Sequence, residues 1–219
     1  MNPLRHYFQN NSGRLIHKWD HYFDIYHRHF ERFRGRPVKV LEFGVFHGGS
    51  LQMWKWYFGG SCQVVGVDIN SACKTLEEDR VQIEIGDQED RQFLRSLAEK
   101  YGPFDIVIDD GGHTMGQQIA TYEELLPAIS ENGVYLVEDL LTSYRLNYGG
   151  GLQRSGTFIE YSKNLIDGLN GWHSQEPEKF GPTEFTRSVW SMHYYDSVLV
   201  IEKAPRQKPW HEKTGRVSF

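Results

Sequence analysis

The sequence predicts an α/β fold: a Rossmann-like, doubly wound, mostly parallel seven-stranded sheet with helices on both faces and an antiparallel last strand. Short apolar runs alternate with helical patterns over the first 140 residues. Most of these runs end in glycine or an acidic residue, and two further β-like runs follow near the carboxyl end. Such alternation is typical of βαβ units, whose parallel strands are joined by right-handed crossovers.

The amino-terminal segment carries a helical pattern. Apolar side chains recur at steps of three and four between residues 13 and 34, which predicts one amphipathic helix there. Gly35 and Pro37 follow as stop signals. Residues 1–36 are therefore predicted to form a helical lid segment. The residues that carry the pattern are Leu15, Trp19, Tyr22, Tyr26, Phe30 and Phe33.

Five strands alternate with helices in the next hundred residues. Each strand is a short, mostly apolar run, and each helix has periodic apolar positions followed by glycine or proline. The predicted strands are 38–44, 63–68, 81–87, 104–110 and 133–139. The predicted helices are 50–59, 71–78, 88–102 and 114–129.

The pattern changes after residue 140. A long glycine-rich loop precedes a helix at 157–169, and strands near 185–194 and 197–202 form a hairpin that closes the sheet. We therefore place the main domain at residues 37–203. The last sixteen residues, 204–219, are basic and contain proline and glycine, which predicts a poorly ordered tail.

Composition narrows the class of protein. A chain of 219 residues is long enough for one domain with a sizeable core. The net charge of −5 argues against nucleic acid as a partner, and no apolar run is long enough to cross a membrane. The first residues lack the apolar core of a signal peptide, and Cys62 and Cys73 provide no disulfide framework. A cytoplasmic protein is expected.

The loop "EFGVFHGGS", residues 42–50, indicates a cofactor site. Its glycines follow a G-x-x-x-G-G spacing, which fits poorly with the G-x-G-x-x-G fingerprint of dinucleotide-binding proteins. Asp68 ends the second strand, where a carboxylate binds the hydroxyls of a ribose. Asp87 and Gln88 end the third strand, where they can bond an adenine edge. The candidate cofactor-binding residues are thus Glu42, Gly44, Gly48, Ser50, Asp68, Asp87 and Gln88.

Glu42-Phe43-Gly44, Asp68 and Gly86-Asp87, at successive strand ends, resemble the motifs of class I S-adenosylmethionine-dependent methyltransferases. The resemblance implies that Asp68 holds the ribose, that the glycine loop faces the methionine part, and that Asp87 lies near the adenine. It also accounts for the irregular glycine spacing, since S-adenosylmethionine has no pyrophosphate.

A second set of polar residues predicts a cation site. "IDDGGH" ends the fourth strand and "VED" ends the fifth, so Asp110, Glu138 and Asp139 are expected at one edge of the sheet. Oxygen ligands with open positions suit Mg²⁺ or another divalent cation, which lowers the pKa of a bound hydroxyl. His113 can then take the hydroxyl proton as a general base.

The combination "IDDGGH…VEDLLTSY", with "KWDHYFDIYHRHF" and "YYDSVLVIEK", resembles the metal-dependent sugar O-methyltransferases of macrolide biosynthesis from about residue 15 to residue 203. The resemblance implies Asp110, Glu138 and Asp139 as metal ligands, with His113 and Asp110 at the catalytic centre. It places Asp109 near the methionine end of the cofactor. Larger members carry an additional amino-terminal domain that helps oligomers assemble, and this chain is expected to lack it.

The predicted function is the Mg²⁺-assisted transfer of a methyl group from S-adenosylmethionine to a hydroxyl of a sugar or glycan. A catechol or another small diol is the nearest alternative acceptor. A nicotinamide-dependent oxidoreductase fits less well because of the glycine spacing and the carboxylates. A degenerate Rossmann-like binding module would be expected to have lost one or more of the carboxylates. The sequence leaves open a homo-oligomeric assembly and the identity of the acceptor.

Overall fold

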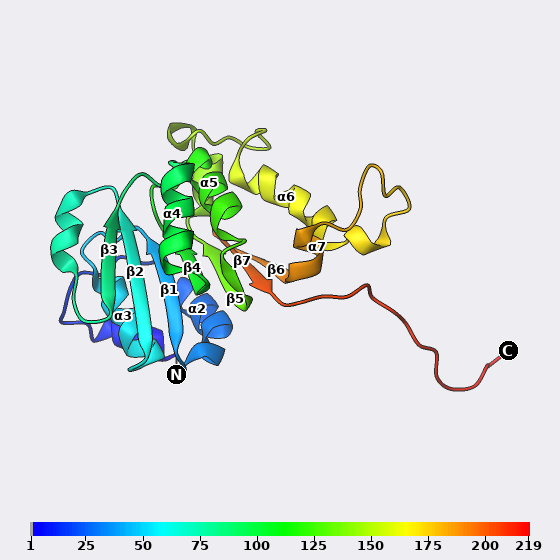
Figure 1. Cartoon of the computed structure of the whole chain (residues 1–219), viewed down its shortest axis with the longest axis horizontal. Helices are drawn as coiled ribbons and strands as arrows, with labels where there is room; N and C mark the ends of the chain where they lie inside the picture. Colours follow the sequence, from blue (N-terminus) through cyan, green and yellow to red (C-terminus); the bar gives the residue numbers. More distant parts are fainter. Residues whose placement is uncertain (1) are drawn as a thin grey trace.

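The computed structural model describes residues 2–219. Seven strands form one sheet in the order β3-β2-β1-β4-β5-β7-β6 (Figure 1). Strands β1 to β5 pair in parallel, whereas β7 is antiparallel to both of its neighbours. The predicted fold class is confirmed. The strands are β1 (Val38–Phe43), β2 (Cys62–Asp68), β3 (Val81–Ile85), β4 (Phe104–Asp109), β5 (Ile129–Val137), β6 (Val189–Tyr195) and β7 (Val198–Lys203).

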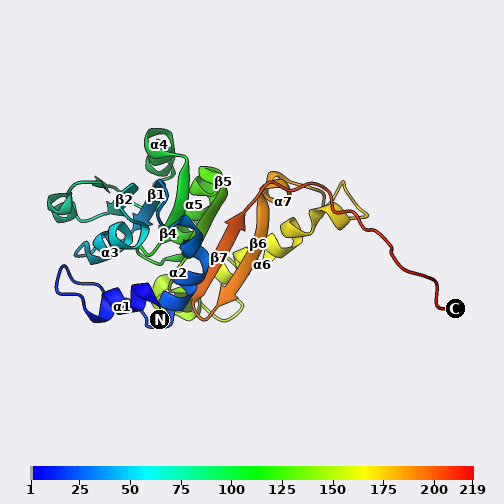
Figure 2. The same ribbon diagram turned by 90° about the horizontal axis from the view of Figure 1, so that it is seen from below.

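Helices cover both faces of the sheet, as Figure 2 shows. One face packs on α1 (Pro3–Gln9), α2 (Tyr22–Phe30) and α3 (Gly49–Phe58). The other packs on α4 (Arg91–Tyr101), α5 (Met115–Leu125) and α6 (Phe158–Leu169). A short helix, α7 (Glu184–Ser188), precedes β6. The 3₁₀ helices are η1 (Glu31–Phe33), η2 (Ser71–Leu76), η3 (Leu140–Tyr144), η4 (Leu146–Tyr148) and η5 (Gly171–His173).

Local sequence explains where the main helices start. Asp90 caps α4 by accepting from the backbone N–H groups of Gln92 and Phe93. Thr114 forms a capping box with Gln117 at the start of α5, and Thr157 caps α6. Each cap satisfies backbone donors that have no partner within the helix.

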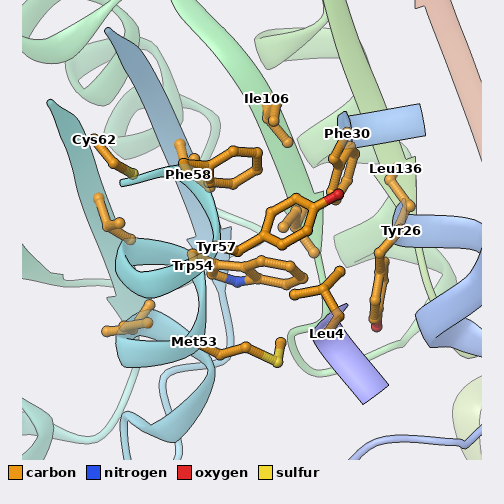
Figure 3. Close-up of a cluster of buried hydrophobic side chains, with 14 of the residues drawn as sticks. Leu4, Tyr26, Phe30, Met53, Trp54, Tyr57, Phe58, Cys62, Ile106 and Leu136 are labelled. Atoms are coloured by element: carbon orange, nitrogen blue, oxygen red, sulfur yellow. The ribbon is translucent and has the colours of Figure 1, made fainter. Parts of the chain in front are cut away.

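An aromatic cluster fixes α2 against α3 (Figure 3). The Trp54 ring on α3 meets Tyr26 of α2 edge to face, with ring centroids 5.2 Å apart, and Phe30 lies 5.9 Å away. All three side chains are fully buried. Such aromatic pairs add stabilisation to the large apolar area that they bury. This packing anchors the amino-terminal segment to the body of the domain.

The helix predicted over residues 13–34 is wrong in its first half. The structure has α1 earlier in the chain, and α2 begins only at Tyr22; residues 11–19 are irregular and cross the amino-terminal end of α3. Arg14 bonds the carbonyl of Leu76 at 2.9 Å, and Lys18 inserts among buried carboxylates. These tertiary contacts override the helical periodicity, which is a weak local preference. Met1, part of the predicted lid, lies outside the described residues.

Smaller differences occur at element ends. The predicted helix at 71–78 is the 3₁₀ helix η2, and β5 starts at Ile129, inside the predicted fifth helix. Residues 184–188 form α7 where a strand was expected to begin. After Lys203 the chain has no regular element and is mostly exposed. Among residues 2–219, no helix is both long and apolar enough to cross a membrane.

The sheet register brings the predicted site residues together. Phe43 of β1 pairs with Val67 of β2 and with Asp109 of β4, and Asp109 pairs with Val137 of β5. The residues that come directly after these strands therefore lie together at the carboxyl edge of the sheet. The strand order reverses between β1 and β4, which is where open α/β sheets bind ligands.

Candidate active site

A pocket of about 570 Å³ opens at the carboxyl edge of the sheet. It is lined by residues at or just after the ends of β1 to β5, and by part of the amino-terminal segment. Seven of the predicted site residues line it: Gly44, Asp68, Gln88, Asp110, His113, Glu138 and Asp139. The other five, Glu42, Gly48, Ser50, Asp87 and Asp109, lie outside the lining.

Asp68 shapes one end of the pocket. Its Oδ2 accepts from the backbone N–H of Phe46 at 3.0 Å, and its Oδ1 accepts from the backbone N–H of Asn70 at 2.9 Å. A carboxylate has about four acceptor positions, so two remain for ligand hydroxyls. Asp68 thus stands at the pocket wall with free acceptor capacity.

The glycine loop is supported from beneath by Glu42. This side chain is fully buried, and its Oε2 accepts from the Ser50 hydroxyl at 2.8 Å. Burial raises the pKa of the Glu42 carboxyl. Gly48 adopts a left-handed conformation and caps α3. These three residues hold the loop and the start of the helix behind the pocket.

Gln88 connects the pocket to a buried network. Its Nε2 donates to Asp109 Oδ1 at 2.6 Å, and its Oε1 accepts from the backbone N–H of Gly112 at 3.0 Å. Asp109 also accepts from the Tyr135 hydroxyl, and burial raises its pKa to about 6. Asp87 is exposed and accepts from the backbone N–H of Glu89. Gln88 is therefore the predicted adenine-side residue that reaches the pocket.

Asp110, His113 and Asp139 form a compact group at the other end of the pocket. One oxygen from each carboxylate and one histidine nitrogen all lie within 4.8 Å of one another. His113 Nε2 lies 3.4 Å from Asp139 Oδ2 and 3.8 Å from Asp110 Oδ1. The donor set is rich in oxygen, which fits a Mg²⁺-type cation better than zinc.

His113 and Asp139 have an unusual backbone conformation. Their φ angles are 58° and 54°, in the left-handed region that residues other than glycine seldom adopt. Such strain concentrates at functional sites, where the surrounding structure enforces it. Here it turns both side chains toward Asp110. His113 Nδ1 is buried without a hydrogen-bond partner among the described residues, so Nε2 is the nitrogen that faces the pocket.

The structure adds Lys18, a residue that the sequence analysis missed. Its ammonium bonds Asp110 Oδ2 and contacts Glu138 Oε1 and Oε2 at 3.1 and 3.0 Å. Glu42 Oε1 lies 3.8 Å away. Burial disfavours the ammonium, but the three carboxylates outweigh this effect and raise the pKa of Lys18. The predicted helix assigned Lys18 no role, and its partners Asp110 and Glu138 lie 92 and 120 residues away along the chain.

Two tyrosines and a tryptophan of the amino-terminal segment fix the same carboxylates. The Tyr22 hydroxyl and Trp19 Nε1 donate to Asp139 Oδ1 at 2.7 and 3.1 Å. The Tyr26 hydroxyl donates to Glu138 Oε1 at 2.6 Å. Burial, with the neighbouring carboxylates, raises the pKa of both tyrosines, so they stay protonated as donors. Asp139 Oδ2 remains free to face His113.

The fold and the site together define a Rossmann-like domain of the class I methyltransferase type. The sheet order, the acidic residue that ends β2 and the acidic group after β4 and β5 all belong to this arrangement. No family model matches the chain. Individual proteins do match it over most of its length.

The chain is homologous to sugar O-methyltransferases of macrolide and tetracenomycin biosynthesis. It is 39% identical over 195 residues to 8-demethyl-8-(2-methoxy-alpha-L-rhamnosyl)-tetracenomycin-C 3'-O-methyltransferase of Streptomyces olivaceus, covering 84% of this chain and 50% of that protein. It is 36% identical to mycinamicin VI 2''-O-methyltransferase of Micromonospora griseorubida, covering 81% of this chain and 47% of the relative. The chain thus spans about half the length of these curated relatives.

A solved structure agrees with the sequence matches. It is MycE methyltransferase in complex with Mg, SAH (S-adenosylhomocysteine) and mycinamycin VI. The TM-score is 0.80 at 33% identity, and the match covers 93% of this chain and 53% of MycE. The fold of MycE methyltransferase is therefore shared over most of this chain.

Proposed function

We propose that this chain is the catalytic domain of an S-adenosylmethionine-dependent O-methyltransferase that acts on a sugar hydroxyl with the help of Mg²⁺. One observation carries the proposal: Asp68 and the Asp110–His113–Asp139 group open onto the same pocket. Asp68 suits the ribose of a nucleoside, and the Asp110–His113–Asp139 group suits a cation next to a general base. The names of the homologous proteins support a sugar as the acceptor.

Each end of the pocket has its own role in this proposal. Asp68 binds the ribose hydroxyls, Gly44 allows the backbone to approach the methionine part closely, and Gln88 lies on the adenine side. Asp110 and Asp139 hold the cation, and Glu138 is the third ligand. Residues 1–36 serve as a lid, since this segment lines the pocket through Lys18, Trp19 and Tyr22. Residues 37–203 form the methyltransferase domain, and residues 204–219 form a tail.

When bound, S-adenosylmethionine supplies an electrophilic methyl group and Mg²⁺ lowers the pKa of a coordinated hydroxyl. His113 accepts the hydroxyl proton at Nε2. Asp139 and Asp110, at 3.4 and 3.8 Å, stabilise the imidazolium that results. Trp19 is 54% exposed at the pocket while its Nε1 bonds Asp139, so its ring is placed to stack on the acceptor sugar.

Calorimetry tests the proposal in two steps. S-adenosylhomocysteine should bind the wild type, and NAD should not. With S-adenosylhomocysteine present, Mg²⁺ should bind the wild type and Asp167→Ala, an exposed residue of α6, but not Asp139→Ala. Binding of NAD in place of S-adenosylhomocysteine would overturn the methyltransferase assignment. Equal Mg²⁺ binding by all three proteins would overturn the assigned metal site.

A further inference from the structure

Lys18 brings a positive charge into the group of carboxylates where the cation site is proposed. Its side chain is only 3% exposed, although it lies on an irregular segment. It contacts Asp110, both oxygens of Glu138 and, at a longer distance, Glu42. Lysine is almost never buried to this degree without paired charges. The ammonium and the carboxylates therefore depend on one another for charge compensation.

The position of Lys18 divides the proposed metal ligands into two sets. Asp110 Oδ1, Asp139 Oδ2 and His113 Nε2 lie close together on the pocket side. Both Glu138 oxygens face the ammonium, and Glu138 Oε1 also accepts from Tyr26. Glu138 is thus engaged by Lys18 and Tyr26, while Asp110 is shared between the two sets. A divalent cation that used all three carboxylates would stand next to the ammonium.

We propose that Lys18 is a tethered cation that occupies the Asp110–Glu138 part of the metal site, and that a divalent cation displaces it in order to bind Glu138. This inference rests on the proposed function. Two positive charges that share carboxylate ligands at a separation of a few ångströms repel each other strongly in a buried site. Lys18 is thus a positioning residue: it keeps the carboxylates assembled without metal and sets the affinity for the metal.

The segment that carries Lys18 is anchored on both sides. Arg14 stays bound to the Leu76 carbonyl and lies 3.4 Å from Glu78, and α2 starts at Tyr22. Only the stretch between these anchors has to adjust when the ammonium leaves the carboxylates. This stretch lines the pocket, so metal binding is linked to the wall that would face the acceptor.

Replacing Lys18 by methionine tests the inference directly. Lys18→Met keeps the length of the side chain and removes the charge. We expect calorimetry, with S-adenosylhomocysteine present, to show Mg²⁺ binding at least about tenfold tighter than in the wild type, because the competing charge is absent. A purely structural role for Lys18 would weaken Mg²⁺ binding instead. Lys55→Met is the matched control: Lys55 is also paired, with Glu78, but does not line the pocket.

A second measurement uses the wild type and does not depend on the folding of a variant. Reductive methylation of lysines, read by mass spectrometry, should leave Lys18 unlabelled in the metal-free protein. Saturating Mg²⁺ should raise labelling at Lys18 and leave labelling of the half-exposed Lys74 unchanged. Mn²⁺ serves as a second probe because it accepts the same oxygen ligands.

The outcomes separate this inference from the proposed function. Mg²⁺ binding that is unchanged or weaker in Lys18→Met, or Lys18 labelling that does not respond to Mg²⁺, would overturn the inference and leave the methyltransferase proposal intact. Binding of S-adenosylhomocysteine without any binding of Mg²⁺ or Mn²⁺, in either protein, would overturn both this inference and the metal-assisted mechanism.

Discussion

Gly44 lies directly against the backbone carbonyl of Asp110, across the boundary between β1 and β4. Gly44 has a φ of 86°, and a β-carbon there would collide with the Asp110 oxygen. Its N–H donates to the carbonyl of Val67 at 2.8 Å. The close approach of Gly44 to Asp110 joins the glycine loop to the proposed metal site.

Gly44→Ala should therefore be strongly destabilising. We expect a loss of about 2–4 kcal/mol in the free energy of unfolding, measured by urea denaturation, because the left-handed conformation and the backbone collision both oppose a side chain. Gly60→Ala is the control, since no atom lies within 4 Å of its added β-carbon. It should change stability by less than about 0.5 kcal/mol. Equal effects at the two positions would contradict the close approach.

Asp68→Asn should weaken cofactor binding. The lost charge removes hydrogen bonds worth about 1.5–3 kcal/mol, which corresponds to roughly 10- to 100-fold in the dissociation constant of S-adenosylhomocysteine. Asp87→Asn makes the same chemical change outside the pocket lining and should have a much smaller effect. Calorimetry on both variants decides the matter. A larger loss for Asp87→Asn would move the nucleoside site toward the exposed edge of β3.

His113→Asn should remove the general base while keeping the backbone. Asparagine tolerates the left-handed conformation better than most residues. We expect kcat for methyl transfer to the proposed sugar acceptor to fall by about 100- to 10,000-fold, with binding of S-adenosylhomocysteine unchanged. His173→Asn, an exposed residue of η5, is the control. Full activity of His113→Asn would show that another group takes the proton.

A cluster of His29, His193 and Glu202, away from the proposed active site, should make stability depend on pH. His193 on β6 faces His29 and Arg28 of α2 and Glu202 of β7. Arg32 of η1 lies 3.6 Å from that carboxylate. Burial, together with the neighbouring positive groups, lowers the pKa of His193 below its usual value near 6.5. As the pH falls, His193 is protonated at a higher pH in the unfolded chain than in the folded chain. His193 therefore lowers the free energy of unfolding as the pH falls below about 6.5.

Thermal unfolding between pH 7 and pH 5 tests this effect. The Tm of the wild type should fall more steeply with decreasing pH than that of His193→Gln, because glutamine has no proton to gain. His211→Gln, in the exposed tail, should behave like the wild type. Parallel curves for the wild type and His193→Gln would exclude His193 as the source of the pH dependence.

The sequence alone determined the sheet and the place of the site. Alternating apolar runs and capped helices specify βαβ units, and the chirality of crossovers leaves few arrangements for them. Polar residues at strand ends then have to gather at one edge. Asp68, Asp110, His113 and Asp139, which were expected at or just after strand ends, all line one pocket.

Only the tertiary structure decided the course of residues 11–21 and the position of Lys18. The helical pattern over residues 13–34 is a local signal, whereas Lys18 lies 92 and 120 residues along the chain from Asp110 and Glu138. Contacts of that separation leave no periodicity in the sequence. The attraction between a buried ammonium and buried carboxylates outweighs the small helical preference of a few residues. The segment is therefore irregular and places Lys18 beside the carboxylates.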